Sequence, residues 1–213
     1  MTAGPCRVLL VDDHAVFRET LAVGLSQGDG IVIVGQASTT AEGLECVHTV
    51  GAEGVDVVVL DLSLPGRGGG DLVAQIAQRY PTIAVLILTS HPADLFIGRL
   101  INQGAAGYLH KSCSLQEVMD AVRTVGTGGR VVAPEVEALC RGEAEEPHEL
   151  LSNREYQVME RLVQGASITR IAEEMNLSVK TISTYRRRLM EKLGMTSNTD
   201  LVAYAIKQGI LNR

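Results

Sequence analysis

The first half of the chain alternates short apolar runs with amphipathic stretches. The apolar runs are Val8–Val11, Ile31–Gly35, Val55–Leu60, Ala84–Leu88 and Tyr108–Leu109. They are apolar at consecutive positions, as in parallel strands that helices cover on both faces. Helical spacing between them predicts helices over Val16–Ser26, Thr40–Thr49, Asp71–Arg79, Asp94–Asn102 and Leu115–Thr124. Five strand–helix units in succession predict an α/β fold with a doubly wound, parallel, five-stranded sheet.

The pattern changes after Val125. Glycines at Gly126–Gly129 end the alternation, and Arg141–His148 is polar and acidic. The sequence therefore predicts a first domain over 1–125, a linker over 126–148 with one helical turn near Pro134–Leu139, and a second domain over 149–213. The second domain is predicted to be all-α, with four helices near Tyr156–Val163, Ser167–Met175, Val179–Leu193 and Leu201–Gln208.

Polar residues mark where these C-terminal helices begin and end. Ser152 with Glu155 and Ser197 with Asp200 have the spacing of capping boxes. Ser178 is placed to cap the longest helix, and Gly194 follows its last apolar position.

Composition agrees with a globular two-domain chain. The 213 residues are 46% hydrophobic and 21% charged, which excludes a disordered chain. The longest apolar runs, such as Ile83–Leu88, are too short to span a bilayer, and the N-terminus lacks the apolar stretch of a signal peptide. The four cysteines are scattered without a C-x-x-C pair, which favours reduced thiols in the cytoplasm over disulfides or a zinc site.

The net charge of −6 is unevenly distributed. Residues 149–213 carry 10 Lys+Arg against 7 Asp+Glu, and the rest of the chain carries 9 against 18. A polyanionic partner is therefore expected to meet the C-terminal domain.

Carboxylates follow two of the predicted strands. Asp12 and Asp13 follow the first strand, and Asp61 ends the third. In a sheet of order 2-1-3-4-5 these positions meet outside the carboxyl ends of the strands, where such folds bind ligands. Three carboxylates at close range require a cation, and Mg²⁺ is the expected one because it prefers oxygen ligands.

A hydroxyl and an ammonium are predicted at the same edge. Thr89 ends the fourth strand, and Lys111 lies just past the fifth. Together they suit a phosphoryl group, because the lysine supplies a point charge and the threonine a hydrogen bond. Asp61 as nucleophile would then form an acyl phosphate.

These residues resemble a known signalling domain. Asp12-Asp13, Asp61-x-x-x-Pro65-Gly66, Thr89 and Lys111 are similar to the receiver domain of two-component response regulators over about Arg7–Val125. The resemblance implies a flavodoxin-like receiver that is phosphorylated on Asp61 by a sensor histidine kinase. It implies Mg²⁺ held by Asp12, Asp13, Asp61 and the backbone carbonyl of Ser63, phosphate contacts from Thr89 and Lys111, and Tyr108 as the switch aromatic. Apart from its own phosphoryl transfer and dephosphorylation, such a domain is not an enzyme.

Two side chains beside this corner are candidates for tuning the phosphate lifetime. They are Ser63 and His91, at positions that vary between receivers. His14, next to the carboxylates, is interpreted as a residue of the helix start.

The helix predicted over Val179–Leu193 has a basic outer side. Ile182, Leu189 and Leu193 form an apolar stripe with Val179 and part of Tyr185. The opposite side carries Lys180, Ser183, Thr184, Arg187 and Arg188. The helix Ile168–Met175 precedes it across a short turn, so the pair has the form of a helix-turn-helix whose second helix fits the major groove.

The motifs of this domain resemble the LuxR-type helix-turn-helix over about Leu150–Leu211. They are Leu151-Ser152-x-Arg154-Glu155, Gly165, Ile171-Ala172, Leu177-Ser178-x-Lys180-Thr181-Ile182 and Lys192-Leu193-Gly194. With the receiver, the chain resembles the NarL/FixJ subfamily of response regulators. The resemblance implies base reading by Ser183, Thr184 and Arg187. It implies phosphate contacts from Lys180, Arg186, Arg188 and Lys192, and Thr181 completes the DNA-binding set.

The expected partners are a sensor histidine kinase and double-stranded DNA, with RNA polymerase as a further candidate and no membrane. A homodimer is expected at least in the phosphorylated or DNA-bound state. Val202 and Ile206 would contribute to it by resemblance, although packing within the domain explains them equally well. Whether phosphate releases the DNA-binding domain or pairs two receivers stays open.

Two other functions would account for part of the sequence. Phosphatases with a nucleophilic aspartate carry Asp-x-Asp, whereas Leu62 and Ser63 follow Asp61, and a phosphatase leaves the helix-turn-helix unexplained. The remaining alternative is a DNA-binding regulator that is never phosphorylated and whose receiver serves as a dimerisation scaffold.

Overall fold

The computed structural model describes residues 4–51, 54–64, 68–90, 93, 95–140 and 147–210. The chain divides into two compact units, Met1–Arg141 and Gly142–Arg213. Pro65, Gly66 and His91, which the sequence placed near the acidic corner, lie outside the described residues.

The first unit is built on a parallel sheet of five strands in the order β2-β1-β3-β4-β5, which confirms the predicted fold. The strands are β1 (Cys6–Val11), β2 (Ile31–Ala37), β3 (Val57–Leu60), β4 (Ala84–Thr89) and β5 (Gly107–His110). The three middle strands, β1, β3 and β4, are almost entirely buried, because helices cover both faces of the sheet.

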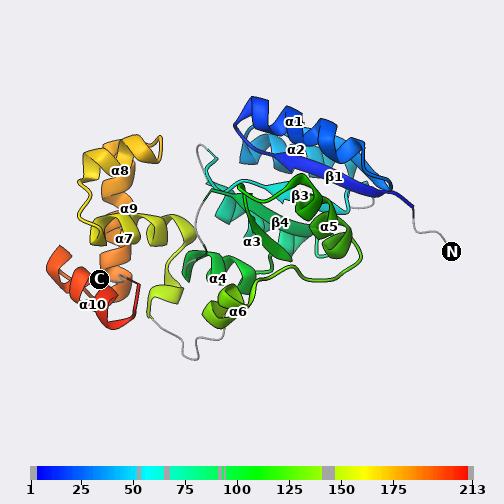
Figure 1. Cartoon of the computed structure of the whole chain (residues 1–213). Coiled ribbons are helices and arrows are strands. Elements are labelled where there is room, and N and C mark those ends of the chain that lie inside the picture. Colours follow the sequence, from blue (N-terminus) through cyan, green and yellow to red (C-terminus); the bar gives the residue numbers. More distant parts are fainter. Residues whose placement is uncertain are drawn as a thin grey trace. The chain divides into compact units, whose positions relative to one another are not determined.

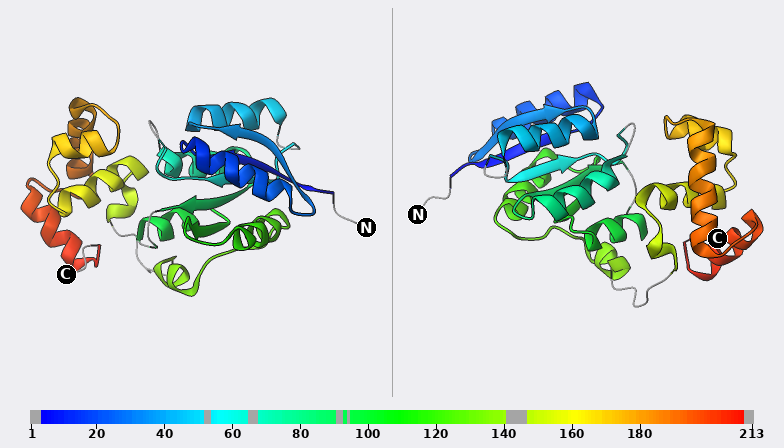
Figure 2. Two further views of the ribbon diagram at one scale, coloured as in Figure 1. Left: turned by 45° about the horizontal axis from the view of Figure 1, so that its top comes forward. Right: turned by 180° about the vertical axis from the view of Figure 1, so that it is seen from behind.

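The helices of this unit form two layers. They are α1 (Ala15–Ser26), α2 (Thr40–Val50), α3 (Gly68–Arg79), α4 (Leu95–Asn102) and α5 (Leu115–Gly126). α1 and α5 cover one face and form a core with the alternate side chains of β1, β3 and β4. α2, α3 and α4 cover the other face (Figure 1; Figure 2). Because the strands are parallel, the carboxyl ends of β1, β3, β4 and β5 lie at the same edge of the sheet.

The first unit continues beyond α5. Val131 pairs with the edge of β5: its N–H donates to the Ala106 carbonyl at 3.0 Å, and its carbonyl accepts from the Tyr108 N–H at 2.9 Å. A helix, α6 (Pro134–Cys140), then packs against α4. Residues 131–140, at the middle of the predicted linker, are therefore attached to the sheet and to α4.

The second unit contains a short 3₁₀ turn, η1 (Pro147–Leu150), and four helices: α7 (Asn153–Val163), α8 (Ile168–Glu174), α9 (Val179–Leu193) and α10 (Asn198–Lys207). The predicted capping boxes of Ser152 with Glu155 and of Ser197 with Asp200 are present. Ser178 caps α9, and Gly194 ends it in the left-handed conformation at φ 65°, which a glycine adopts without steric cost.

Neither unit has an element suited to a bilayer: within the described ranges, no helix has both the length and the apolar character needed to cross one. The four cysteines are free thiols and half-buried.

Candidate functional site: the acidic corner and the basic helix

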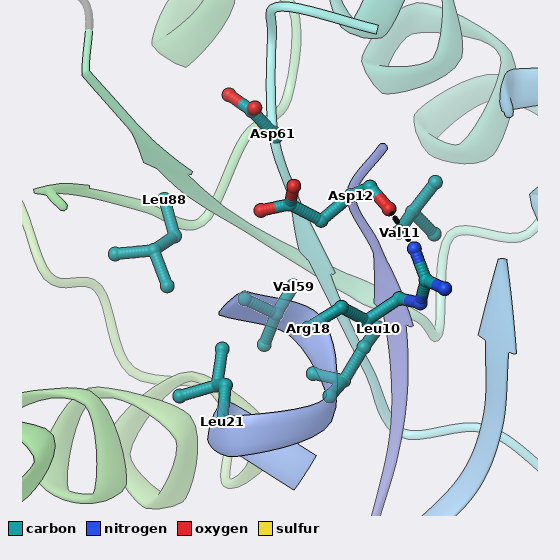
Figure 3. Close-up of a pocket in the computed structure, with 8 residues that line it drawn as sticks. All are labelled: Leu10, Val11, Asp12, Arg18, Leu21, Val59, Asp61 and Leu88. Atoms are coloured by element: carbon teal, nitrogen blue, oxygen red, sulfur yellow. Dashed lines mark hydrogen bonds between the residues drawn. The ribbon is translucent and has the colours of Figure 1, made fainter. Parts of the chain in front are cut away.

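The acidic corner lies where β1 and β3 end. Asp12 directly follows β1 and Asp61 directly follows β3, and their side chains are 9% and 1% exposed. Asp13, the next residue of the β1–α1 turn, is 33% exposed. Figure 3 shows Asp12 and Asp61 on neighbouring strands, above a cavity of about 10 Å³ that is otherwise lined mostly by apolar side chains. That volume holds at most one water molecule, so a ligand must approach from the outer side of the corner.

Lys111 bridges the two buried carboxylates. Its Nζ lies 2.7 Å from Asp12 Oδ2 and 2.8 Å from Asp61 Oδ2. Burial lowers the pKa of Lys111, but the hydrogen bonds and charges of the two aspartates more than offset that effect, and the net pKa is raised. The ammonium is therefore charged at neutral pH, and it neutralises one of the three carboxylates.

Two backbone amides and an imidazole complete the corner. The His14 N–H donates to Asp12 Oδ1 at 2.8 Å, and the Ser63 N–H donates to Asp61 Oδ1 at 3.2 Å. His14 occupies the N-cap position of α1, as the sequence suggested. Its Nδ1 is 3.0 Å from Asp13 Oδ1 and 3.3 Å from Asp12 Oδ1, so its side chain also belongs to the corner.

The corner fits a divalent cation. One ligand atom from each of Asp12, Asp13, His14 and Asp61 can be chosen so that all lie within 4.8 Å of one another. Three carboxylates and the Lys111 ammonium leave a charge of about −2, which a divalent cation balances. The oxygen-rich donor set agrees with the preference of Mg²⁺.

Thr89 and Tyr108 occupy the positions expected from the sequence. Thr89 ends β4 and is fully buried, and its carbonyl accepts from the Lys111 N–H at 2.8 Å. Tyr108 lies in β5 and is 8% exposed. The strand ends thus bring Asp61, Thr89 and Lys111 to the same edge of the sheet, as their order in the sequence predicts.

Three further residues contribute to the corner without having been predicted from the sequence. The Lys111 Nζ lies 4.6 Å from the centre of the Phe17 ring, in cation–π contact. Arg18 donates from Nη1 to the Asp12 carbonyl (Figure 3). Gly69 in the first turn of α3 lies so close to β3 that a Cβ there would be 2.4 Å from the Asp61 carbonyl oxygen. A glycine run was visible in the sequence, but its close contact with Asp61 was not.

α9 presents most of its predicted DNA-binding side chains to solvent. Lys180, Ser183, Arg187 and Arg188 are exposed, and Thr184 is half-exposed. The hydroxyls of Ser183 and Thr184 donate to the carbonyls of Val179 and Lys180 at 2.8 and 2.9 Å. Their oxygens can still accept hydrogen bonds from the outer side. Val179, assigned to the apolar stripe from the sequence, is 48% exposed.

Four members of the predicted DNA-binding set interact with other side chains of the protein. Arg186 donates from Nε and Nη2 to Asn198 Oδ1 in α10, at 3.1 and 2.9 Å. Lys192 Nζ lies 2.6 Å from the buried Glu155 Oε2. Arg187 pairs with Glu191 at 3.2 Å on the exposed side of α9. The Thr181 hydroxyl lies 2.8 Å from the Ser178 hydroxyl, inside the N-cap.

Two family models match the chain. Residues 8–123 match the response regulator receiver domain, and residues 149–205 match the bacterial regulatory proteins of the luxR family. The receiver match covers more than half of the chain and includes Asp12, Asp61, Thr89 and Lys111. The chain belongs to the response regulators. It combines a receiver with a LuxR-type DNA-binding domain, as the sequence predicted.

Known response regulators are similar to this protein along nearly its whole length. Response regulator UvrY of Escherichia coli K12 is 36% identical over 211 residues, which cover 96% of this chain and 95% of that protein. Response regulator GacA of Pseudomonas aeruginosa is 32% identical over 212 residues, covering 97% and 98%. Both the receiver and the helix-turn-helix are thus shared in the same order.

Solved response regulators have the same fold. The crystal structure of ChrA, a response regulator of a heme-sensing two-component system, is 32% identical, with a TM-score of 0.53 over 98% of this chain and all of that chain. RcsB of Salmonella enterica serovar Typhimurium, solved bound to a promoter in the presence of the phosphomimetic BeF₃⁻, is 22% identical, with a TM-score of 0.60 over 94% and 98% of the chains. At that identity RcsB supports the fold alone.

Proposed function

We propose that a sensor histidine kinase phosphorylates this response regulator on Asp61 and that the phosphate controls sequence-specific DNA binding by the C-terminal domain. The observation that carries the proposal is the pairing of the buried Asp61 with Lys111, at 2.8 Å. Both groups sit where Thr89 ends the neighbouring strand. A nucleophile, a cation and a hydroxyl then surround the position of a transferred phosphoryl group.

In the transfer, an Asp61 carboxylate oxygen attacks phosphorus while the bond from phosphorus to the donor histidine nitrogen breaks. Lys111 neutralises charge on the phosphoryl oxygens, and Thr89 donates a hydrogen bond to one of them. Asp12, Asp13, Asp61 and the Ser63 carbonyl would hold Mg²⁺, which offsets the negative charge of carboxylates and phosphate. Phe17 keeps the Lys111 ammonium at the corner through its ring face.

For DNA, the exposed side of α9 is the proposed reading surface. Ser183, Thr184 and Arg187 are proposed to contact base edges, and Lys180 and Arg188 to contact phosphates. Arg186 and Lys192 can reach phosphate only by leaving the partners they have in the free protein, Asn198 and Glu155. Their role in DNA binding is therefore secondary in this proposal.

A dimer is proposed for the DNA-bound state. One solved structure contains two RcsB dimers bound to two parallel DNAs, and two half-sites multiply the affinity of each domain. In α10, Ile206 is 45% exposed and Val202 is half-buried, which leaves an apolar side chain for such a contact. A cytoplasmic location is part of the same proposal, because the sensor kinase would phosphorylate the protein there, and RNA polymerase stays a candidate partner.

The decisive experiment is labelling by acetyl phosphate in the presence of Mg²⁺, followed by intact-protein mass spectrometry. Wild type is expected to gain one phosphoryl group. Asp61→Asn is expected to gain none, and omission of Mg²⁺ should also prevent labelling. Asp120→Asn is the matched control, because it removes a carboxylate that is exposed on α5. Wild type that takes up no label would favour a receiver that serves only as a dimerisation scaffold.

A further inference from the structure

Phe17 is a half-buried aromatic residue that contacts the cation of the acidic corner. It is the third residue of α1 and follows Asp12 by five positions. The same connection after β1 therefore carries both a carboxylate of the corner and the ring. The Lys111 Nζ lies 4.6 Å from the centre of this ring. At that distance the negative face of an aromatic ring attracts an ammonium.

Lys111 thus contacts groups of two different kinds. Its Nζ lies 2.7 Å from Asp12 Oδ2 and 2.8 Å from Asp61 Oδ2, and both of these groups are carboxylates of the corner to which the metal ion and the phosphoryl group are proposed to bind. The Phe17 ring has no net charge and no ionisable group. Its attraction for the ammonium therefore does not depend on what binds to the carboxylates.

Phosphoryl transfer weakens one of the two carboxylate contacts. Asp61 loses its carboxylate charge as the bond to phosphorus forms, so its attraction for Lys111 falls. Asp12 keeps its charge and draws the ammonium toward the end of β1, away from Asp61 at the end of β3. A lysine side chain is long and flexible. A contact that is independent of Asp61 is therefore needed to keep the ammonium beside the phosphoryl oxygens.

Packing alone does not account for an aromatic ring at this position. Phe17 packs against the core that α1 and α5 form with the sheet, which another apolar side chain of similar size could do. Phe17 also borders a cavity of about 170 Å³, which Lys111 and Val118 line as well. The ring thus leaves space beside it unfilled, while the ammonium lies over its face.

We propose that Phe17 is a positioning residue for the phosphoryl transfer and that it acts through the negative face of its ring. The ring holds the Lys111 ammonium beside the phosphoryl oxygens while Asp61 gives up its carboxylate charge. The contact gains importance as the bond to phosphorus forms, which is the condition for raising the rate rather than only stabilising the ground state. This inference rests on the proposed phosphorylation of Asp61.

The test changes the charge on the ring face and keeps the shape of the ring. Fluorine withdraws electrons from an aromatic ring and adds little volume. Phenylalanine with one, two or three fluorine atoms is therefore incorporated at position 17 of the full chain, and the initial rate of labelling by acetyl phosphate with Mg²⁺ is measured. The rate is expected to fall with each added fluorine, by about fivefold for three of them, as the cation–π contact is lost.

Phe96 provides the matched control. It is the other of the two phenylalanines in the chain, and it is 2% exposed in α4. The same fluorinated residues at position 96 report any general effect of fluorine on the folded receiver. They should leave the labelling rate unchanged, because this ring is not part of the acidic corner.

Two natural substitutions form a second arm of the test. Phe17→Leu keeps an apolar side chain but removes the ring, so labelling should slow. Phe17→Tyr keeps the ring face, and the neighbouring cavity gives room for its hydroxyl, so it should retain most of the rate that Phe17→Leu loses. If Phe17→Leu does not fold, the fluorine series still decides the question because its members keep the shape of the ring.

The positioning role is refuted if wild type takes up label on Asp61 but the rate does not depend on the number of fluorine atoms at position 17. An equal fall in rate with fluorine at positions 17 and 96 would refute it as well. Wild type that takes up no label would instead refute the proposed function, so the two failures are distinguishable.

Discussion

At the scale of single residues, Lys192 shows how a predicted DNA contact acquires a structural role. Its ammonium is 2.6 Å from Glu155 Oε2 and 3.1 Å from the Leu150 carbonyl. The Glu155 side chain is 4% exposed. A buried carboxylate without a cation is costly, so Lys192 supports the α7–α9 contact before it can support DNA binding.

We expect Lys192→Met to destabilise the C-terminal domain by about 2 kcal/mol, less than for a fully buried pair because the lysine is partly exposed. Lys180→Met, which removes an exposed lysine of the same helix, should leave stability unchanged and weaken DNA binding. Calorimetric unfolding of the full chain measures the first effect, and titration with duplex DNA measures the second. Equal stability of the two variants would contradict the structural role of Lys192.

The same pair predicts a pH dependence. Burial raises the pKa of Glu155, but hydrogen bonds from Lys192 and Ser152 outweigh it, so the net pKa is lowered. A carboxyl whose pKa is lowered in the folded state contributes stability that is fully present above its unfolded pKa of about 4.3. That stability is lost as the pH falls through the folded-state pKa. The stability difference between wild type and Lys192→Met should therefore be widest at neutral pH and narrow below about pH 4. A difference that stays constant with pH would argue against this origin.

At the scale of secondary-structure elements, the start of α3 positions the phosphoacceptor. The sequence predicts this helix from Asp71, but α3 begins three residues earlier, at Gly68. Gly69 packs against the backbone of Asp61 and Leu62, with no room for a Cβ. The close packing of this helix start fixes the end of β3, and with it the direction of the Asp61 side chain.

Gly69→Ala is expected to push α3 away from β3 and to slow labelling by acetyl phosphate at least ~10-fold, because misplacement by about 1 Å costs a positioned reaction more than that. Gly43→Ala is the matched control, because its Cβ would meet side chains and no backbone atom, with Val11 at 3.2 Å and Leu72 at 3.6 Å. Initial labelling rates of both variants at equal Mg²⁺ check the prediction. Similar rates in the two variants would show that the α3 contact is not required.

At the scale of the whole molecule, the functional question is how strongly phosphate at one domain changes DNA binding at the other. Coupling between two sites in a protein is typically ~1–3 kcal/mol, or 5–150-fold in affinity. Duplexes selected from a random library by the phosphorylated full chain should therefore bind the unphosphorylated chain at least ~5-fold more weakly. Equal affinities would support the phosphorylation-independent alternative.

The same selected duplexes test the proposed reading surface. Arg187→Ala should relax the sequence preference at one base pair. Lys180→Met should instead lower the affinity for all duplexes alike and reduce the salt dependence of that affinity by the equivalent of about one phosphate contact.

Much of this protein follows from the order of its residues. The apolar runs predict a parallel sheet, and parallel strands must present their carboxyl ends at one edge, so the sequence alone places Asp12, Asp61, Thr89 and Lys111 together. The caps at Ser152, Ser178, Ser197 and Gly194 are local signals, and all four are present. The helices α7 and α10 nevertheless begin three residues before the predicted Tyr156 and Leu201, directly after their caps.

Only the tertiary structure decided which partner each side chain has. Helical periodicity assigns Arg186 and Lys192 to a side of α9, but their partners Asn198 and Glu155 come from other helices that pack against it. Likewise, the contact of Phe17 with Lys111 and the contacts of residues 131–140 with β5 and α4 join segments that are far apart in the chain. Local patterns report on neighbours within a few residues, whereas these contacts depend on how distant surfaces fit together, which no local pattern encodes.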